Sequence, residues 1–338
     1  MPLVSVIIVN FDGLHHLKEC LDSLRVQTFR DFETILVDNA STDGSAEFVK
    51  EHYPEVMVVR NGKNLGYGGG NNAGIRVSQG RYVVLLNNDT KADARWLQRL
   101  REVADRDQTV GMCASKIMNY YQSGIFDNTG LLMYRDGVAR GRGRLEKDSG
   151  QYDSEEEVFF PSGCAGLYKR EMMDEIGLFD EDFFLYMDDV DIGLRGRLAG
   201  WRCVYVPGAV VYHKYSATTE PYSPLKAYLV ERNRIWVVMK YFPVRMAVQS
   251  AFFTLLRYVL QGYGVLTGKG ASSRIVQSTS LFEGMKILLR AYVSAFRGFA
   301  IILRKRREVM KLKKVSNRDM AGWFTRFGIS AKEVALKE

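Results

Sequence analysis

Acidic and amide side chains follow several short apolar runs of the sequence, at positions where they could bind a metal ion or a phosphate group. The runs and the residues that follow them are Val4–Val9 with Asn10, Thr34–Val37 with Asp38, and Tyr82–Leu86 with Asn88 and Asp89. A carboxylate at the end of a buried strand can hold Mg²⁺ against substrate phosphates, because this ion takes only one or two protein carboxylates. Asp89 fits that role, and an aspartate in a turn or helix cap would give the same pattern. For Asp38, taken alone, a turn is the favoured interpretation and a nucleoside-binding carboxylate is the alternative.

A second acidic cluster lies further along the chain. Asp188, Asp189 and Asp191 follow the apolar stretch 183–187 directly. Acidic residues in a first helical turn are favoured by the helix dipole, which is a structural explanation for part of this cluster. A carboxylate beside apolar surface can also have a raised pKa and act as a general base. His213 follows a late predicted strand, 209–212, and is interpreted either as a structural histidine or as a ligand of a metal or diphosphate.

The elements that must position these side chains alternate between strands and helices. Strands are predicted at Val4–Val9, Thr34–Val37, Val56–Val59 and Tyr82–Leu86. A helix follows the first of them, with leucines on one face, and we expect Asp12 to cap it. This alternation predicts an α/β fold with a mostly parallel sheet flanked by helices. Ligands of such sheets bind beyond the carboxyl ends of the strands, where Asn10, Asp38 and Asp89 all fall.

A glycine-rich segment lies between residues 64 and 74, with the sequence Asn64-Leu-Gly-Tyr-Gly-Gly-Gly-Asn-Asn-Ala-Gly74. We expect a loop here, because glycine permits close backbone approach and backbone amides can line an anionic ligand. The segment lacks the Gly-Lys-Ser/Thr ending of a phosphate-binding P-loop, so that nucleotide-binding motif is excluded.

The charge of the chain is unevenly distributed. The 338 residues carry a net charge of +8, and their composition is that of a globular protein, which excludes disorder and fibrous repeats. Residues 221–338 hold 22 Lys and Arg against 6 Asp and Glu, whereas residues 1–220 hold 25 against 33. We therefore expect two regions, one at 1–220 that carries the candidate site residues and a basic helical one at 221–338. A nucleic-acid binder of uniform basic charge does not have this asymmetry.

The basic region carries the pattern of a membrane-surface helix. Apolar and aromatic residues recur between 244 and 303 with Lys and Arg interleaved, which favours an anionic membrane surface over nucleic acid. Helices that pack on the catalytic domain, or form a homodimer interface, are the structural alternatives. The stretch Met246–Gly268 is long enough to span a bilayer, but Arg257 interrupts it and disfavours spanning.

The cysteines and the N-terminus indicate a cytoplasmic protein. Cys20, Cys113, Cys164 and Cys203 are scattered without metal-ligand spacing, as expected of buried free thiols in a reducing compartment. The first apolar run has the length of a strand and no basic segment before it, so it is not interpreted as a signal peptide. We expect a cytoplasmic protein, peripheral on the inner face of the cell membrane.

The ordered set of motifs resembles the family 2 glycosyltransferases, which have the GT-A fold, and among them the bacterial rhamnosyltransferase-like members. The motifs are Val4-Ser-Val-Ile-Ile-Val-Asn10, Leu36-Val-Asp-Asn-Ala-Ser-Thr-Asp43, Asn64-Leu-Gly with Asn71-Asn-Ala-Gly74, Leu85-Leu-Asn-Asn-Asp89, Ser162-Gly-Cys-Ala-Gly-Leu-Tyr-Lys-Arg170, Gly177-Leu-Phe-Asp-Glu181, Phe184-Leu-Tyr-Met-Asp-Asp189-Val-Asp-Ile-Gly-Leu-Arg195, Gly200-Trp201 and His213. The match covers residues 3 to 240, and the order of the motifs makes it specific.

The resemblance implies a role for each matching residue. The residues implied in nucleotide and phosphate binding are Asn10, Asp38, Asn64, Asn88, Asp89, Arg232 and Arg234, with Asp38 reading the nucleobase. Asp89 is similar to the last acid of the family's Asp-x-Asp motif and would hold Mg²⁺ or Mn²⁺, together with His213. Asp189 is similar to the second acid of the family's Glu-Asp pair, the general base, and Asp188 stands beside it in that pair.

Two positions depart from the family pattern. Asn87 stands where the first acid of Asp-x-Asp is expected, so metal dependence rests on Asp89 and His213. Asp188 replaces the Glu of the Glu-Asp pair, which shortens that side chain and leaves Asp189 intact.

The resemblance implies an inverting glycosyltransferase that moves a sugar, rhamnose being the first candidate, from a dTDP- or UDP-linked donor to a lipid-linked or cell-surface glycan. Catalysis then needs positive charge at the diphosphate leaving group and one carboxylate that accepts the proton of the attacking hydroxyl. A sugar nucleotidyltransferase is one alternative, although the turn after Val9 lacks its basic residues. A non-catalytic glycan- or membrane-binding scaffold of the same fold is the other.

Overall fold

The structure is a computed structural model that describes residues 1–214, 223–278 and 280–337. The chain forms two compact units. The first unit comprises Met1–Leu131 and Gly141–Thr218, and the second comprises Leu132–Arg140 and Thr219–Glu338. The predicted domain boundary between residues 220 and 221 lies outside the described residues.

The first unit is built on a ten-stranded mixed sheet. Its path runs β10-β12-β6-β11-β4-β1-β2-β3, and the bounds are β1 Val4–Asn10, β2 Phe32–Asp38, β3 Met57–Arg60, β4 Tyr82–Leu86, β6 Val110–Asn119, β10 Glu156–Val158, β11 Ala165–Lys169 and β12 Arg202–His213. The short strands β5 (Thr90–Ala92) and β7 (Phe126–Asn128) pair with β12 and β6. Strands β4, β1, β2 and β3 are parallel neighbours, while β11 runs antiparallel between β4 and β6. The predicted α/β fold is confirmed.

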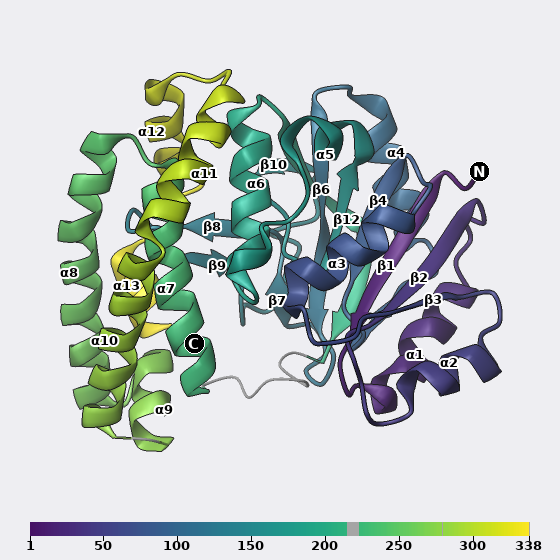
Figure 1. Ribbon diagram of the computed structural model, residues 1–338, viewed down its shortest axis with the longest axis horizontal. Coiled ribbons are helices and arrows are strands. Elements are labelled where there is room, and N and C mark those ends of the chain that lie inside the picture. Colours follow the sequence, from purple (N-terminus) through teal and green to yellow (C-terminus); the bar gives the residue numbers. More distant parts are fainter. Residues whose placement is uncertain (215–222, 279, 338) are drawn as a thin grey trace. The chain divides into compact units, whose positions relative to one another are not determined.

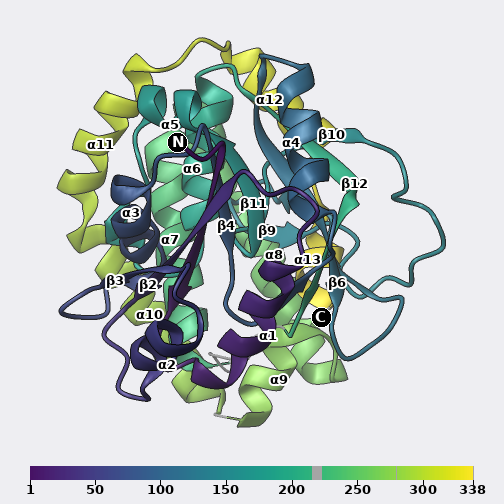
Figure 2. The same ribbon diagram turned by 90° about the vertical axis from the view of Figure 1, so that its right-hand side faces the viewer.

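Helices cover both faces of this sheet. The side chains of β1 point alternately to one face and to the other, so apolar side chains on both faces need a covering layer. Ile8 packs in a core with residues of α1 (Leu14–Arg25) and α4 (Trp96–Arg106), whereas Ile7 faces α3 (Gly66–Val77). In Figure 2, α3 lies to the left of the strands and α4 to the right. The remaining helices of the unit are α2 (Ser45–His52), α5 (Arg170–Ile176), α6 (Asp188–Leu198) and a 3-10 turn, η1 (Glu181–Phe183).

The glycine-rich segment is a helix, α3, and the expectation of a loop is wrong. The glycines allow this helix to pack closely on its neighbours. A Cβ on Gly70 would lie 2.7 Å from Val9, and one on Gly74 would lie 2.6 Å from Ile7. Tertiary packing therefore stabilises a helix that its glycine content disfavours by about 1 kcal/mol per glycine.

The second unit is helical apart from a short hairpin. Its helices are α7 Pro224–Tyr241, α8 Val244–Thr267, α9 Gly270–Ser278, α10 Leu281–Arg297, α11 Phe299–Lys311, α12 Asn317–Arg326 and α13 Ala331–Leu336 (Figure 1). The hairpin joins β8 (Leu131–Met133) to β9 (Ala139–Gly141), and Met133 donates its amide to the carbonyl of Phe327 at 3.1 Å. In the part of the chain that the structure describes, no helix is long and apolar enough to cross a membrane.

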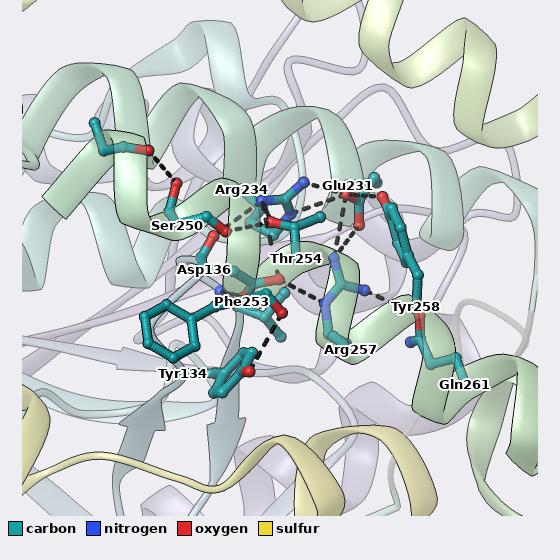
Figure 3. Close-up of polar contacts among 12 residues, drawn as sticks. Tyr134, Asp136, Glu231, Arg234, Ser250, Phe253, Thr254, Arg257, Tyr258 and Gln261 are labelled. Atoms are coloured by element: carbon teal, nitrogen blue, oxygen red, sulfur yellow. Dashed lines mark hydrogen bonds and ion pairs between the residues drawn. The ribbon is translucent and has the colours of Figure 1, made fainter.

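Two acidic and two basic side chains form a buried ion cluster in this unit, made of Asp136, Glu231, Arg234 and Arg257. Arg257 Nε lies 2.6 Å from Asp136 Oδ2, and its Nη2 lies 3.0 Å from Glu231 Oε2. Arg234 pairs with Glu231, and all four side chains are 5% exposed or less. Figure 3 shows these groups converging from the hairpin, α7 and α8, with Tyr258 donating to Glu231. Arg257, which interrupts the apolar stretch in the sequence, is therefore buried in the unit and paired.

Candidate active site

Three of the predicted polar residues meet at the carboxyl ends of the parallel strands. Asn10 and Asp38 are the last residues of β1 and β2 and lie opposite each other in the parallel register. Asn88 follows β4, and its Nδ2 donates to Asn10 Oδ1 at 2.6 Å. All three side chains are buried. The fold thus gathers at one sheet edge residues that lie far apart in the sequence, as the alternation of strands and helices predicts.

Asp38 and Asn64 belong to a polar network beside this edge. The amide of Ser41 donates to Asp38 Oδ1 at 3.3 Å, so the residues after β2 form the turn that the sequence favours. Asn39 Nδ2 donates to Asn64 Oδ1 at 3.2 Å and to the carbonyl of Gly66 at 2.9 Å. A buried carboxylate among amides offers both acceptors and donors, which the edges of a nucleobase require.

Asp89 and His213 face each other in the interior of the first unit. His213 ends β12 and pairs with Thr90 of β5, the residue after Asp89, which explains their closeness. His213 Nε2 lies 3.4 Å from Asp89 Oδ1, and both side chains are 8% exposed or less. Asp89 Oδ1 has no hydrogen bond of good geometry to any described residue. A buried carboxylate oxygen in this state is an acceptor ready for a cation.

Each of these two groups favours the charged form of the other. Burial opposes ionisation of Asp89, but the nearby His213 outweighs it and holds the pKa of Asp89 below its usual value. Burial also opposes protonation of His213, yet Cys164, Asp127 and Asp89 around the ring raise its pKa well above the usual range. The two groups therefore favour an ion pair, with Asp89 ionised and His213 protonated.

The pair also fits a divalent cation. Ligand distances of ~2.1 Å in an octahedral site put neighbouring ligand atoms about 3 Å apart, close to the 3.4 Å between Nε2 and Oδ1. Within the described ranges, no group of three or more His, Cys, Asp or Glu side chains could hold a metal ion. A cation at Asp89 and His213 would therefore take its other ligands from phosphate oxygens and water, as Mg²⁺ commonly does.

Sequence reasoning missed a residue that contacts His213. Asp127, in β7, places Oδ2 at 2.6 Å from His213 Nδ1, so the ring lies between two carboxylates. Arg144 Nη1 donates to the other oxygen of Asp127 at 2.7 Å. Asp127 lies 86 positions before His213 in a three-residue strand. Neither hydrophobic periodicity nor a motif singles it out.

The second acidic cluster begins α6 and follows a strained turn. Phe184, Tyr186 and Met187 have φ angles of 64°, 64° and 65°, a region that costs a non-glycine residue about 1 kcal/mol or more. Gly66, with φ of 74°, lets this turn approach α3, because a Cβ there would lie 2.1 Å from the Phe184 carbonyl oxygen. The amide of Tyr67 donates to the same oxygen at 2.7 Å. Strain of this kind is concentrated at functional sites of proteins.

The three acids of this cluster differ in their surroundings. Asp191 is paired with Arg195 at 3.0 Å and is structural. Asp188 is 4% exposed, and its Oδ2 finds no hydrogen-bond partner among the residues described. Asp189 is partly exposed and accepts from the amides of Gly163 at 3.1 Å and Val190 at 2.8 Å. Asp189 is therefore the acid of this cluster that a substrate can reach.

Burial sets the proton affinity of both unpaired acids. It raises the pKa of Asp188 well above the usual range, and the neighbouring Asp189 raises it further. Burial also raises the pKa of Asp189, although the amides of Gly163 and Val190 oppose the shift. A carboxylate with a raised pKa is a stronger base, which suits proton abstraction.

Arg232 and Arg234 lie in the second unit, on α7. Arg232 stacks on Trp236, with its guanidinium carbon 4.4 Å from the ring centroid, and donates to Asn233 Oδ1 at 2.8 Å. Arg234 belongs to the buried ion cluster and also donates to the carbonyl of Asp136 at 2.9 Å. Phosphate binding by either arginine stays a prediction.

Comparison with known proteins adds a family match and several relatives. Residues 5–177 match the model of glycosyl transferase family 2. The chain is 30% identical over 270 residues to N-acetylglucosaminyl-diphospho-decaprenol L-rhamnosyltransferase of Mycobacterium tuberculosis, covering 69% of this chain and 86% of that protein. It is 27% identical over 227 residues to the O-antigen biosynthesis protein RfbC of Myxococcus xanthus, covering 64% of this chain and 18% of that protein.

Two solved structures illustrate the likeness in fold. The crystal structure of GalNAc-T7 with UDP, GalNAc and Mn²⁺ superposes with a TM-score of 0.61 at 17% identity, over 77% of this chain and 51% of that chain. The mannosyltransferase PcManGT of Pyrobaculum calidifontis, in complex with GDP-Man and Mn²⁺, superposes with a TM-score of 0.52 at 14% identity, over 88% and 87% of the two chains.

Proposed function

The chain belongs to glycosyl transferase family 2 and has the GT-A fold, and from this premise we propose that it is an inverting, metal-assisted glycosyltransferase with Asp189 as its general base. The donor is a nucleoside-diphosphate sugar, with dTDP-rhamnose as the first candidate because a rhamnosyltransferase is 30% identical to the chain. The acceptor is a hydroxyl of a lipid-linked or cell-surface glycan.

The single observation that carries this proposal is the setting of Asp189. It is a partly exposed carboxylate with a pKa raised by burial, at the start of α6 and held by two backbone amides. These bonds fix its orientation and leave it able to accept the proton of an acceptor hydroxyl. The hydroxyl oxygen then forms a bond to the anomeric carbon while the bond from that carbon to the diphosphate oxygen breaks. One in-line displacement of this kind inverts the anomeric centre.

The leaving group needs positive charge at the other side of the sugar. Asp89 and His213 would hold Mg²⁺ or Mn²⁺ at the diphosphate, and the bound cation would neutralise the charge that develops on the departing oxygen. Asn87 in place of a further acid leaves Asp89 as the carboxylate ligand. Two proteins with the same fold contain Mn²⁺ together with a nucleotide or nucleotide sugar, which supports a divalent cation at the donor.

The polar edge of the sheet suits the nucleotide. Asp38 would accept from the nucleobase. Asn10 and Asn88, which are hydrogen-bonded to each other, and Asn64, which is bonded to Asn39, would complete the pocket. Asp38 is buried and fixed by the Ser41 amide, so it needs no rearrangement to read a base. Preorganised acceptors of this kind favour binding because little conformational entropy is lost.

The acceptor proposal rests on an apolar face of the second unit. Of the 25 large hydrophobic side chains that are exposed in the described chain, 16 lie on α8, α10 and α11. Those of α8 are Val244, Val248, Phe252, Leu255, Leu256, Val259, Tyr263 and Leu266. The same helices carry exposed basic residues, among them Arg245, Lys286 and Arg290. The sequence of α8 contains no acid, and α10 contains one, Glu283, which pairs with Lys286. An apolar face with basic residues beside it is complementary to an anionic bilayer, which is where a lipid-linked acceptor would be found.

The catalytic proposal is tested by a donor screen. Purified full-length protein is mixed with dTDP-, UDP- and GDP-sugars in Mn²⁺ or Mg²⁺, and nucleoside diphosphate release is measured with and without a polyprenyl-diphosphate glycan acceptor. Asp189→Asn should lower kcat by about 10²- to 10⁴-fold and leave donor binding intact, whereas Asp174→Asn, an exposed acid of α5, should behave as wild type. Wild-type turnover by Asp189→Asn would refute the mechanism, and the absence of release with any donor would favour the scaffold alternative.

The membrane proposal is tested by co-sedimentation with vesicles. Burying a Phe or Leu side chain stabilises by roughly 1.5–3 kcal/mol, so Phe252→Ser combined with Phe282→Ser should weaken binding to phosphatidylglycerol vesicles by more than about 10-fold. Tyr121→Ser, which removes an exposed aromatic residue of the first unit, is the matched control. If the double variant binds as well as wild type but loses a dimer in light scattering, the apolar face is a homodimer interface and the membrane proposal is wrong.

A further inference from the structure

His213 is held between two carboxylates that approach different nitrogens of its ring. Nδ1 lies 2.6 Å from Asp127 Oδ2, whereas Nε2 lies 3.4 Å from Asp89 Oδ1. All three side chains are 8% exposed or less. The short contact of the ring is therefore the one between Nδ1 and Asp127. Nε2 lies next to Asp89 at a longer distance.

Asp127 is itself fixed from behind. Arg144 Nη1 donates to Asp127 Oδ1 at 2.7 Å, so the two oxygens of this carboxylate have separate partners. Asp127 lies in β7, which pairs with β6, and β6 pairs in turn with β12, the strand that ends at His213. The carboxylate thus reaches the ring from a neighbouring part of the same sheet, and Arg144 prevents it from rotating away.

We propose that Asp127, supported by Arg144, is a positioning residue that directs Nε2 of His213 toward the cation held with Asp89. A cation that binds His213 takes the place of the proton on Nε2, and the neutral imidazole that results keeps its one N–H on the other nitrogen. With Nδ1–H donated to Asp127, the lone pair is on Nε2, the nitrogen beside Asp89. Histidine ligands of metals commonly donate their second nitrogen to a carboxylate, which fixes tautomer and orientation. This inference rests on the proposed function.

A merely structural Asp127 is the competing explanation, because its pairing with Arg144 would also stabilise the sheet. The two roles predict different measurements. A positioning residue changes the affinity for the cation and the dependence of turnover on cation concentration, and its effect vanishes once His213 is removed. A structural residue changes the unfolding curve and leaves cation affinity unaltered.

The test measures Mn²⁺ binding to the full-length protein in the presence of UDP or dTDP, by the electron paramagnetic resonance signal of free Mn²⁺. Asp127→Asn should weaken Mn²⁺ affinity by about 10- to 100-fold, because an amide can donate to Nδ1 and favour the wrong tautomer. Arg144→Gln should weaken it less, since the carboxylate remains. Asp148→Asn, which loses a carboxylate paired with Lys116 at 2.7 Å in the same unit, should bind Mn²⁺ as wild type does.

A double-mutant cycle separates the possible results. His213→Ala alone should lose Mn²⁺ affinity, and adding Asp127→Asn to it should cause no further loss. Wild-type affinity in Asp127→Asn, or a further loss in the double variant, would overturn the inference. If His213→Ala itself bound Mn²⁺ as wild type does, the metal site of the proposed function would fail instead. Thermal unfolding of each variant identifies any loss of affinity that comes from misfolding.

Discussion

The contact between Gly66 and the turn before Asp188 offers a sharp test of how the site is positioned. Gly66 has a φ of 74°, and a Cβ at this residue would lie 2.1 Å from the carbonyl oxygen of Phe184 and 2.6 Å from its side chain. Because the nearest atom is backbone, the neighbouring turn must move to admit a methyl group. That turn leads directly into Asp188 and Asp189.

Two effects add in the variant Gly66→Ala. An L-residue in the left-handed region costs about 1–2 kcal/mol, and overpacking adds about 1–3 kcal/mol. Gly124→Ala isolates the first effect, because Gly124 has a φ of 71° and nothing lies within 4 Å of its Cβ position. We therefore expect Gly66→Ala to destabilise the protein by about 2–5 kcal/mol and Gly124→Ala by about 1–2 kcal/mol.

Activity provides the second readout. Displacement of a catalytic group by about 1 Å can lower the rate by about 100-fold, so Gly66→Ala should lower kcat by about 10- to 100-fold at saturating donor. Gly124→Ala should keep wild-type kcat because its loop carries no site residue.

Denaturant unfolding and steady-state turnover are the two assays for this pair of variants. Equal unfolding free energies and equal kcat in the two alanine variants would refute the reasoning, because the turn at Phe184 would then move to admit the methyl group without loss of stability. Loss of stability with normal kcat would show that the turn moves without carrying Asp189.

Four further predictions follow from the buried charges and thiols. Asp188→Asn should stabilise the protein by about 1–3 kcal/mol at pH 8 and by less at pH 5, measured as Tm. The pKa of Asp188 is raised in the folded protein, so the stability of the wild type falls as pH rises toward that pKa, and the variant lacks this loss. Arg257→Met should cost about 3–5 kcal/mol in urea unfolding, and the exposed Arg245→Met should cost almost nothing. Arg257 and Arg234, against the effect of burial, lower the pKa of Glu231 to about 2, so the stability from Glu231 should be lost as pH falls from 5 toward 2, seen by circular dichroism. Burial raises the pKa of Cys20 to about 12, and this thiol should resist maleimide at pH 7.5 until the protein unfolds, measured by mass spectrometry; modification of the native chain would contradict its burial.

The strands of the first unit were predictable because their apolar runs are short and end in polar residues. The cap of α1 was not. The sequence favours Asp12, the acid nearest to the helix start, but the amide of Leu14 donates to Asp43 Oδ2 at 2.8 Å. Asp12 instead accepts from the amide of Thr42 at 2.7 Å. Each loop thus accepts a backbone amide of the other, across 29 and 30 positions, and local propensity contains no information on such contacts.

The candidate site was predictable where residue type and strand position coincide. Asn10, Asp38 and Asn88 end neighbouring strands, and any parallel sheet gathers them. Asp127 contacts His213 because β7 lies beside it, and Arg144 reaches Asp127 from the residues that follow β9, which no motif records. The glycine-rich segment was predicted as a loop because glycine disfavours helices, and packing against β1 reverses that preference.

The hairpin that carries Asp136 gives the second unit an unusual order of assembly. Asp136 and its partner Arg257 are 121 positions apart, and the whole second segment of the first unit, residues 141–218, is synthesised between them. At about 5–20 residues per second, the carboxylate of Asp136 leaves the ribosome's active centre about 6–24 s before the guanidinium that will neutralise it. During synthesis, the core of the second unit therefore cannot form until α8 has emerged from the ribosome. Until then Asp136 stays hydrated, because the helices that bury it are translated later.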